Sequence, residues 1–291
     1  MHRGFPYALT LEDFSIDRYP SGEARNYSSS IHARSLDGKE VDFTCSVNRP
    51  ARLDGWRIYQ TGYDTKAGDA SGYSIVQCVK DPLYPVIAAS LWAMIAGAFL
   101  LFLKNIPGKK KKGLWTLIAV LFIFFVYLTM DRVGIGSHDL RPALRSGWFV
   151  PHIVAYMFAY SIMATVTIYA IVLAARSGKK AVGPKDTAAL ARTVKLGWAF
   201  MTMGMCMGAL WAKQSWGDWW TWDPKETWAL LTWIAYGAFF HLAHRIKPKW
   251  SFSILFVSFL LDLLDLVERL DQLFIGVRQR LDIDDAAFGF P

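Results

Sequence analysis

The stretch that decides the fold is Asp81–Phe102, which reads DPLYPVIAASLWAMIAGAFLLF. It carries no charge after Asp81, and its length matches the ~20 apolar residues that a helix needs to cross a bilayer. Similar blocks follow it, and 53% of the chain is hydrophobic, which indicates a membrane protein rather than a soluble domain. The predicted spans are Pro82–Leu103, Leu114–Met130, Trp148–Ala174, Val194–Ala212 and Glu226–His244.

A sixth apolar block, Phe252–Leu261, runs directly into Asp262, Asp265 and Glu268. Carboxylates are costly at bilayer depth, so this end is interpreted as an amphipathic or partly inserted helix. The predicted fold class is therefore a membrane protein, an all-α transmembrane bundle of about 5–6 helices, with a small N-terminal β-rich soluble domain. The predicted divisions are the β-rich domain (residues 1–80), the first transmembrane helix (81–104), the main transmembrane domain (114–245) and a divergent amphipathic C-terminal segment (246–291).

Residues 1–80 are polar and resemble strands. The segments SSSIHARSLDG and GWRIYQTGYD mix β-branched and aromatic residues with Asp-Gly and Gly, which predicts hairpins. A sheet of this size is marginal alone, so we expect it to pack on the membrane part or on another chain. Cys45 and Cys78 both lie in this domain, where they either pair in an oxidising compartment or stay unpaired.

The basic residues give the orientation. The net charge of +8 lies in short runs between apolar blocks, such as KNIPGKKKKG and RIKPK, which is typical of cytoplasmic loops and argues against nucleic acid. The N-terminal domain and the loop before the fifth span then share the outer side. The domain must cross ahead of its first span, so either that span pulls it across or the chain is a piece of a longer protein.

The loop before the fifth span is rich in tryptophan. It reads WGDWWTWDPKE, and a scattered interfacial belt is the alternative to a ligand site for its indoles. A dense indole surface suits a large, flat, apolar ligand, and a glycine allows close backbone approach. The sequence therefore predicts a haem site formed by Trp216, Gly217, Trp219, Trp220, Trp222 and Asp223.

Two histidines are the candidate ligands of the haem iron, because neutral imidazole is the usual axial ligand. His152 lies just inside the outer end of the third span, at the level of the tryptophan loop. His241 lies fifteen residues beyond Glu226, about 22 Å along a helix, which places it near the inner face. Satisfied packing is the alternative for each histidine alone, whereas together they indicate a path for one ligand.

These residues match a known family pattern. Trp211–Arg245, WAKQSWGDWWTWDPKETWALLTWIAYGAFFHLAHR, closely resembles the tryptophan-rich WWD signature of haem-handling proteins in cytochrome c biogenesis. LRPALRSGWFVPHIVAYMFAYS resembles the stretch that carries the family's first external haem-ligating histidine, which falls on His152. The family's transmembrane histidine falls on His241. VNRPARLDGWRIYQTGYD, together with the first span, is similar to the end of the partner subunit of the system II cytochrome c synthase.

The resemblance implies a multi-pass protein of the bacterial inner membrane with its tryptophan loop on the periplasmic side. Haem b would move from the inner side past His241 and be held at the outer side by His152 and a second external histidine. There it would be joined through thioether bonds to the CxxCH thiols of apocytochrome c. The implied partners are apocytochrome c, a missing half of the synthase and the lipid bilayer, and the implied enzyme is a cytochrome c haem lyase or a subunit of one. The chain departs from the family after His241, because its end has no histidine in place of the second external ligand. A haem exporter component and a truncated non-catalytic remnant are the alternatives.

Overall fold

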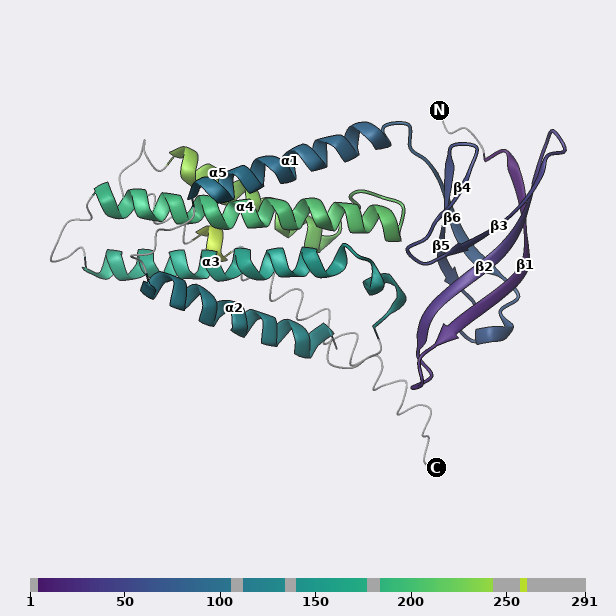
Figure 1. Cartoon of the computed structure of the whole chain (residues 1–291), viewed down its shortest axis with the longest axis horizontal. Helices are drawn as coiled ribbons and strands as arrows, with labels where there is room; N and C mark the ends of the chain where they lie inside the picture. Colours follow the sequence, from purple (N-terminus) through teal and green to yellow (C-terminus); the bar gives the residue numbers. More distant parts are fainter. Residues whose placement is uncertain (1–4, 106–111, 134–139, 177–183, 243–256, 261–291) are drawn as a thin grey trace, which may run out of the picture. The chain divides into compact units, whose positions relative to one another are not determined.

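A computed structural model describes residues 5–105, 112–133, 140–176, 184–242 and 257–260 (Figure 1). It has a β-rich N-terminal region followed by helices, as the sequence predicts. The chain divides into two compact units, which are described separately below. The first comprises residues 1–93, 133–153 and 206–220, and the second comprises residues 94–132, 154–205 and 221–291.

The N-terminal region forms two antiparallel sheets of three strands each, with the orders β1-β2-β3 and β4-β5-β6. The strands are β1 (Tyr7–Arg18), β2 (Ala24–Ser35), β3 (Glu40–Ser46), β4 (Ala51–Leu53), β5 (Trp56–Tyr63) and β6 (Ser74–Lys80). A small apolar core joins the two sheets, with buried side chains from both of them. Its buried members are Tyr7, Ile31, Ala33, Cys45, Leu53 and Ile58.

A two-residue turn connects β4 to β5. Its central residues Asp54 and Gly55 have φ angles of 45° and 80°. Positive φ at both positions is the geometry of a type I′ hairpin turn, which Asp-Gly adopts more readily than most dipeptides. The turn fixes the strand register, and this register places Arg52 directly opposite Arg57.

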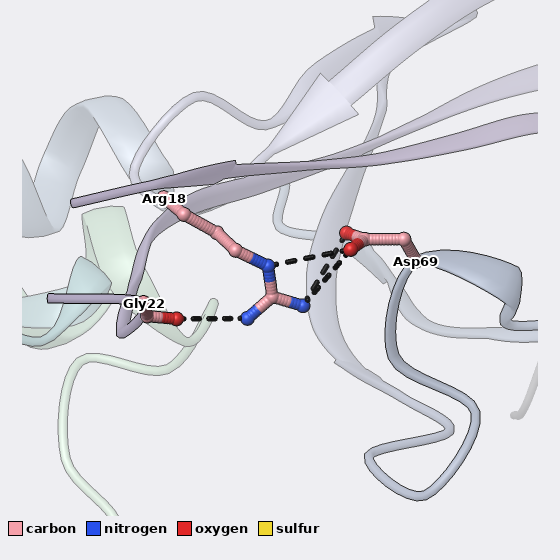
Figure 2. Close-up of polar contacts among 3 residues, drawn as sticks. All are labelled: Arg18, Gly22 and Asp69. Atoms are coloured by element: carbon pink, nitrogen blue, oxygen red, sulfur yellow. Dashed lines mark hydrogen bonds and ion pairs between the residues drawn. The ribbon is translucent and has the colours of Figure 1, made fainter. Parts of the chain in front are cut away.

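A surface contact ties the first sheet to the chain between β5 and β6. Arg18 donates to the carbonyl of Gly22 at 3.0 Å and to the carboxylate of Asp69 at 3.3 Å (Figure 2). Gly22 lies in the turn between β1 and β2, and Asp69 lies in the short 3-10 helix η1 (Gly68–Ala70). Because both charged side chains are exposed, the pair contributes little to stability.

Five α-helices follow in the described part of the chain. They are α1 (Tyr84–Asn105), α2 (Lys112–Val133), α3 (Phe149–Arg176), α4 (Pro184–Ser215) and α5 (Pro224–Leu242), and a 3-10 turn, η2 (Pro142–Arg145), precedes α3. Helix α4 begins at Pro184, ten residues before the predicted fourth span, so a more polar segment belongs to the same helix. That segment, PKDTAALARTVK, contains three alanines, a leucine, two lysines and an arginine, which are good helix formers, although its charged residues make it too polar to span a membrane.

In the second unit, contacts between phenylalanine rings, one edge-on and two stacked, link four of the helices. Phe102 of α1 contacts Phe200 of α4 with ring centroids 5.3 Å apart. Phe158 of α3 stacks on Phe200 at 5.1 Å and on Phe122 of α2 at 4.1 Å. Such ring pairs add specific geometry to the apolar packing of the helices.

Helix α4 also packs closely against α3 and α5. At Gly204 an added Cβ would lie 2.7 Å from the ring of Tyr156, so only glycine fits this approach of α3 and α4. Trp198 of α4 stacks on Trp233 of α5 with centroids 4.7 Å apart. The indole of Trp233 in turn donates to the hydroxyl of Thr202 at 2.8 Å. Small residues and buried polar contacts of this kind are typical of helix packing in membranes.

Two helices in the described residues are long and apolar enough to cross a membrane, judged by length and composition. They are α1 and the Phe149–Leu173 part of α3, and a shorter apolar segment, Trp115–Tyr127, lies in α2. Only 6% of the apolar window of α1 is buried, against 61% of that of α3. The complete transmembrane bundle stays a prediction, and most of the segment 246–291 lies outside the described residues.

Candidate functional site

The tryptophan-rich loop begins with a tight turn at the end of α4. Gly217 has a φ of +92°, which an L side chain rarely adopts. A Cβ at this position would lie 2.9 Å from the ring of Tyr59 and 3.2 Å from Val79. The sequence predicted close approach at Gly217 to a ligand, whereas the structure uses this space for Tyr59 of β5 and Val79 of β6.

A buried ion pair holds the same turn. The ammonium of Lys213, whose side chain is 5% exposed, lies 2.7 Å from the carboxylate of Asp81. Lys213 also donates to the carbonyl of Gly217 at 2.8 Å, and the indole of Trp219 donates to Asp81 at 2.9 Å. Burial opposes ionisation of Asp81, but the hydrogen bonds from Lys213 and Trp219 outweigh it and hold the pKa of this carboxyl below its usual value.

Asn48 is a second connection between the β-rich region and the helical segments of the first unit. Its side chain donates to the carbonyl of Pro142 at 2.8 Å and accepts from the hydroxyl of Ser215 at 2.6 Å. Its own carbonyl accepts from Gln214 at 3.1 Å. Asn48 has a φ of 63°, a conformation that asparagine tolerates better than most residues. The expectation that this domain packs on the helical part is met within the first unit.

A cavity of about 340 Å³ lies among these segments, a volume in the range of small-molecule sites. Five of its thirteen lining residues are aromatic, and one of these, Trp219, belongs to the tryptophan loop. Trp219 packs on Tyr84 with centroids 5.1 Å apart, and Trp92 meets Trp148 edge-on at 5.7 Å. The lining residues are Asn48, Pro50, Arg52, Arg57, Tyr59, Tyr84, Ala88, Trp92, Trp148, Leu210, Lys213, Gln214 and Trp219.

His152 lies in the first turns of α3, where its backbone N–H donates to the carbonyl of Trp148 at 3.1 Å. Its half-buried ring lies against α4, and a Cβ on Gly208 would come within 2.8 Å of it. Glycine at position 208 therefore makes room for the imidazole. The ring also lies 5.8 Å from that of Trp211, which is 5.0 Å from the ring of Trp216. Trp211 thus connects the predicted iron ligand to the first tryptophan of the loop.

The other predicted residues have different surroundings. Trp216 is 42% exposed and Trp220 is half-buried. Trp222, in the second unit, is 69% exposed and has a φ of 60°, an uncommon conformation for a bulky residue. Asp223 accepts from the backbone N–H of Glu226 at 2.7 Å and so caps the N-terminus of α5.

His241 belongs to the second unit. It lies in the last turn of α5, and its side chain is exposed. The structure places His152 and His241 in different units, and their roles as haem ligands stay predictions.

Four charged residues of the site were not identified from the sequence, namely Asp81, Lys213, Arg52 and Arg57. Asp81 has partners that are distant in the chain; Asp81 and Trp219, for example, are 138 positions apart. A signal was nevertheless present for Lys213, which follows a long apolar run, because a charge at such a place calls for a partner.

Cys45 and Cys78 are free thiols in the structure. Of the two alternatives left open by the sequence, a disulfide and unpaired thiols, the structure has the second. Burial, together with the neighbouring Cys78, raises the pKa of Cys45 to about 11. Burial also raises the pKa of Cys78. Because the thiolate is the reactive form, neither group is prepared for nucleophilic chemistry near neutral pH.

Comparison with known proteins identifies the helical part. The family model described as Cytochrome C assembly protein matches residues 83–266, more than half of the chain. The chain belongs to this family. A second model, described as the ResB-like family, matches residues 1–83 of this cytochrome c assembly protein. The resemblance found in the sequence, of a WWD-type protein joined to the end of its partner subunit, is thereby confirmed.

Similar curated proteins carry the description cytochrome c biogenesis protein CcsA. The protein of Chlamydomonas reinhardtii is 31% identical over 164 residues, which cover 53% of this chain and 46% of the relative. That of Prochlorococcus marinus strain MIT 9303 is 28% identical over 206 residues, covering 58% and 64% respectively. That of Guillardia theta is 29% identical over 161 residues, covering 46% and 53%. The chain therefore spans about half the length of the curated relatives it matches.

Proposed function

We propose that this chain holds haem b at the outer face of a bacterial inner membrane and presents it for attachment to apocytochrome c. The observation that carries the proposal is the cavity of the first unit, which combines five aromatic side chains, including Trp219, with polar and cationic ones. Indole and phenol faces suit a flat tetrapyrrole with an apolar body and polar edges. Family membership supports the same ligand class, because the relatives are described as cytochrome c biogenesis proteins.

The chain's own residues would bind and orient haem rather than react with it. His152 would supply an imidazole to the iron, and Trp211 and Trp216 form aromatic contacts that extend from it. Gly208 leaves room for the imidazole, so the ring is held against α4 by packing. Such packing would keep the His152 imidazole in one orientation toward the haem iron while apocytochrome c binds.

The covalent step would use the thiols of the substrate. Each thiol of the CxxCH motif adds across one vinyl group, so that sulfur bonds to one vinyl carbon and hydrogen goes to the other. The addition needs neither oxidant nor reductant. Cys45, with a pKa of about 11, stays protonated and does not compete with the substrate thiols.

The remaining parts of the proposal concern the route and the partners. His241, at the end of α5, would contact haem on its way from the inner side. A second external histidine and the rest of the synthase would be supplied by a partner or the missing half of the synthase. The exposed apolar face of α1 would contact lipid.

The test is haem retention by the purified chain. Wild-type protein, purified in mild detergent from haem-replete cells, should carry a Soret band, and His152→Ala should lose or shift it because an axial ligand is removed. Trp220→Ala should lower the haem content. His32→Ala is the matched control, because His32 lies on β2 and contacts Asp42 instead of the cavity. Equal haem content and identical spectra in all four proteins would contradict the outer-site assignment.

Co-expression separates maturation from export. With the missing half of the synthase supplied, the wild-type chain should produce an apocytochrome c that retains haem after denaturation, which marks a thioether bond. His152→Ala should reduce this product. Haem delivered to the outer side without any thioether-linked cytochrome would favour the exporter alternative.

A further inference from the structure

We infer that Arg52 and Arg57 bind the two carboxylates of a planar tetrapyrrole, so that the ResB-like segment anchors the propionate edge of the haem. The inference rests on the function proposed above and adds to it a subsite contributed by the β-rich region. It starts from an arrangement that is unfavourable in the absence of an anion.

The two arginines are paired across a hairpin. Arg52 of β4 lies directly opposite Arg57 of β5, in the register set by the Asp54–Gly55 turn, and both line the cavity. Like charges in directly opposed cross-strand positions repel one another. An anion between them would remove this repulsion and accept hydrogen bonds from two guanidinium groups, each of which can bind a carboxylate through two parallel N–H donors.

The cavity supplies no compensating negative charge of its own. The residues that line it include three cations and no carboxylate. Lys213 is already matched, because it is bonded to Asp81. In the part of the chain that the structure describes, Arg52 and Arg57 form no ion pair. The excess of positive charge in the cavity therefore lies on the two arginines.

The neighbours of the arginines favour a ring over a small anion. The guanidinium carbon of Arg57 lies 3.5 Å from the centre of the Tyr84 ring, a cation–π contact that holds the group in place. Tyr84 in turn packs on Trp219 at 5.1 Å. A cationic edge next to aromatic faces matches a ligand that has carboxylates on one edge and an apolar body, and haem has this chemistry.

The phosphate of an acidic phospholipid is a second source of negative charge near a membrane surface. It would satisfy the arginines, but it would have no need of the aromatic walls formed by Trp92, Trp148 and Trp219. The two occupants differ in one testable respect. Esterification of the propionates removes their two negative charges and leaves the porphyrin ring and its iron unchanged.

The experiment compares haemin with haemin dimethyl ester. Both are titrated into the 291-residue chain in zwitterionic detergent, and Kd is read from the Soret band. The wild type should bind the diacid about 10-fold or more tightly than the diester, as expected for charge-assisted hydrogen bonds. The Arg52→Gln/Arg57→Gln variant should bind the two ligands within about twofold of one another. Because the ester partitions more strongly into detergent, the informative quantity is the change in this ratio between proteins.

The controls use matched substitutions. Arg34→Gln removes the same charge from β2, where Arg34 pairs with Glu40 on the surface, and should keep the wild-type ratio. Arg52→Gln alone changes an exposed side chain and gives the test if the double variant does not fold. Arg52→Lys/Arg57→Lys keeps the charge without the planar fork and should give an intermediate ratio.

The outcomes are distinguishable. His152→Ala should weaken both ligands and keep their ratio, because the iron ligand and the propionate anchor act on different parts of haem. A wild-type ratio near one, or the same ratio in wild type and double variant, would overturn the anchoring role while leaving haem binding intact. Wild type that binds neither ring would contradict the proposed function, and the anchoring role with it. Two results together would assign the site to lipid. The wild type would bind phosphatidylglycerol vesicles more tightly than phosphatidylcholine vesicles in a way that depends on the two arginines, and it would bind haemin and its dimethyl ester with equal affinity.

Discussion

The two halves of the tryptophan-rich loop are held by different kinds of interaction. Residues 216–220 belong to the first unit, where the buried Asp81–Lys213 pair and the close approach of Gly217 to Tyr59 fix them. Residues 221–226 belong to the second unit, where Asp223 caps α5 and Glu226 accepts from the backbone N–H of Thr221 at 2.6 Å. The first half depends on distant segments of the chain, and the second on its own neighbours.

This difference indicates how one loop can combine a fixed element with an adaptable one. Buried charge pairs are costly to break, so they define a single arrangement of Trp219. A local cap stabilises the start of a helix but does not constrain the exposed indole of Trp222. Substitutions in the first half should therefore have large effects on stability, and those in the second half small ones.

The largest expected effect comes from breaking the buried pair. Lys213→Met would leave the Asp81 carboxylate, whose side chain is only 16% exposed, without its cation and should lower the free energy of unfolding by about 3–5 kcal/mol. The change is measured as the loss in thermal unfolding midpoint, followed by tryptophan fluorescence in detergent. Asp81→Asn in the same chain removes the unpaired charge and should restore much of the stability.

An exposed pair in the same region is the control for this prediction. Lys39 lies 3.1 Å from Asp54, and both side chains are about half exposed, at 54% and 52%. Lys39→Met should therefore cost no more than about 1 kcal/mol. Equal losses for Lys213→Met and Lys39→Met would contradict the importance of burial at Asp81.

Acid pH is expected to weaken the first half in a milder way. The hydrogen bonds from Lys213 and Trp219 hold the pKa of Asp81 below its ordinary value, which is about 3.9. A carboxyl with a lowered pKa in the folded state stabilises the fold above the ordinary pKa, and this contribution is lost as pH falls through the folded pKa. Below about pH 4, the unfolding midpoint should fall more steeply in the wild type than in Asp81→Asn. Parallel pH profiles for the two proteins would rule out this titration as a source of acid sensitivity.

The cap of the second half should contribute less. Asp223→Ala removes the acceptor for the Glu226 amide and should lower stability by about 1 kcal/mol, the usual cost of losing an N-cap. Asp223→Asn keeps an acceptor at the same place and should stay close to wild type. The measurement is again the unfolding midpoint, and a loss from Asp223→Ala as large as that from Lys213→Met would remove the distinction between the two halves.

The fold was largely predictable because its signals are local. The apolar block of α1 and the Asp-Gly turn of the β4–β5 hairpin need only neighbouring residues to be recognised. The predicted fourth span, Val194–Ala212, is shorter than the helix α4 that contains it, for a related reason. Hydropathy identifies the segment that is apolar enough to span a membrane, whereas a helix continues for as long as its residues have helical propensity.

The site was less predictable because its charged members act through tertiary contacts. The tryptophans and His152 were identified from composition and family resemblance, but the pairing of Lys213 with Asp81 depends on how the chain folds back. The arginine pair is an intermediate case. In ARLDGWR a two-residue turn at Asp54–Gly55 already places Arg52 opposite Arg57, so the sequence contained the pair although not the cavity that they line.

The smallest expected effect on stability is at Trp222, the most exposed tryptophan of the loop. Its φ of 60° is unfavourable for a residue with a side chain, by about 1–2 kcal/mol, and glycine would relieve this strain at an entropic cost of about 0.5–1 kcal/mol. Because the side chain is 69% exposed, little buried area is lost. Trp222→Gly should thus change the free energy of unfolding by less than about 1 kcal/mol, while Trp219→Gly, which also breaks a hydrogen bond to Asp81, should cost clearly more. If Trp222 contacts haem, Trp222→Gly should lower the haem content of a protein that unfolds at the wild-type temperature. Normal haem content together with higher stability would mean that the strained indole has no part in the site.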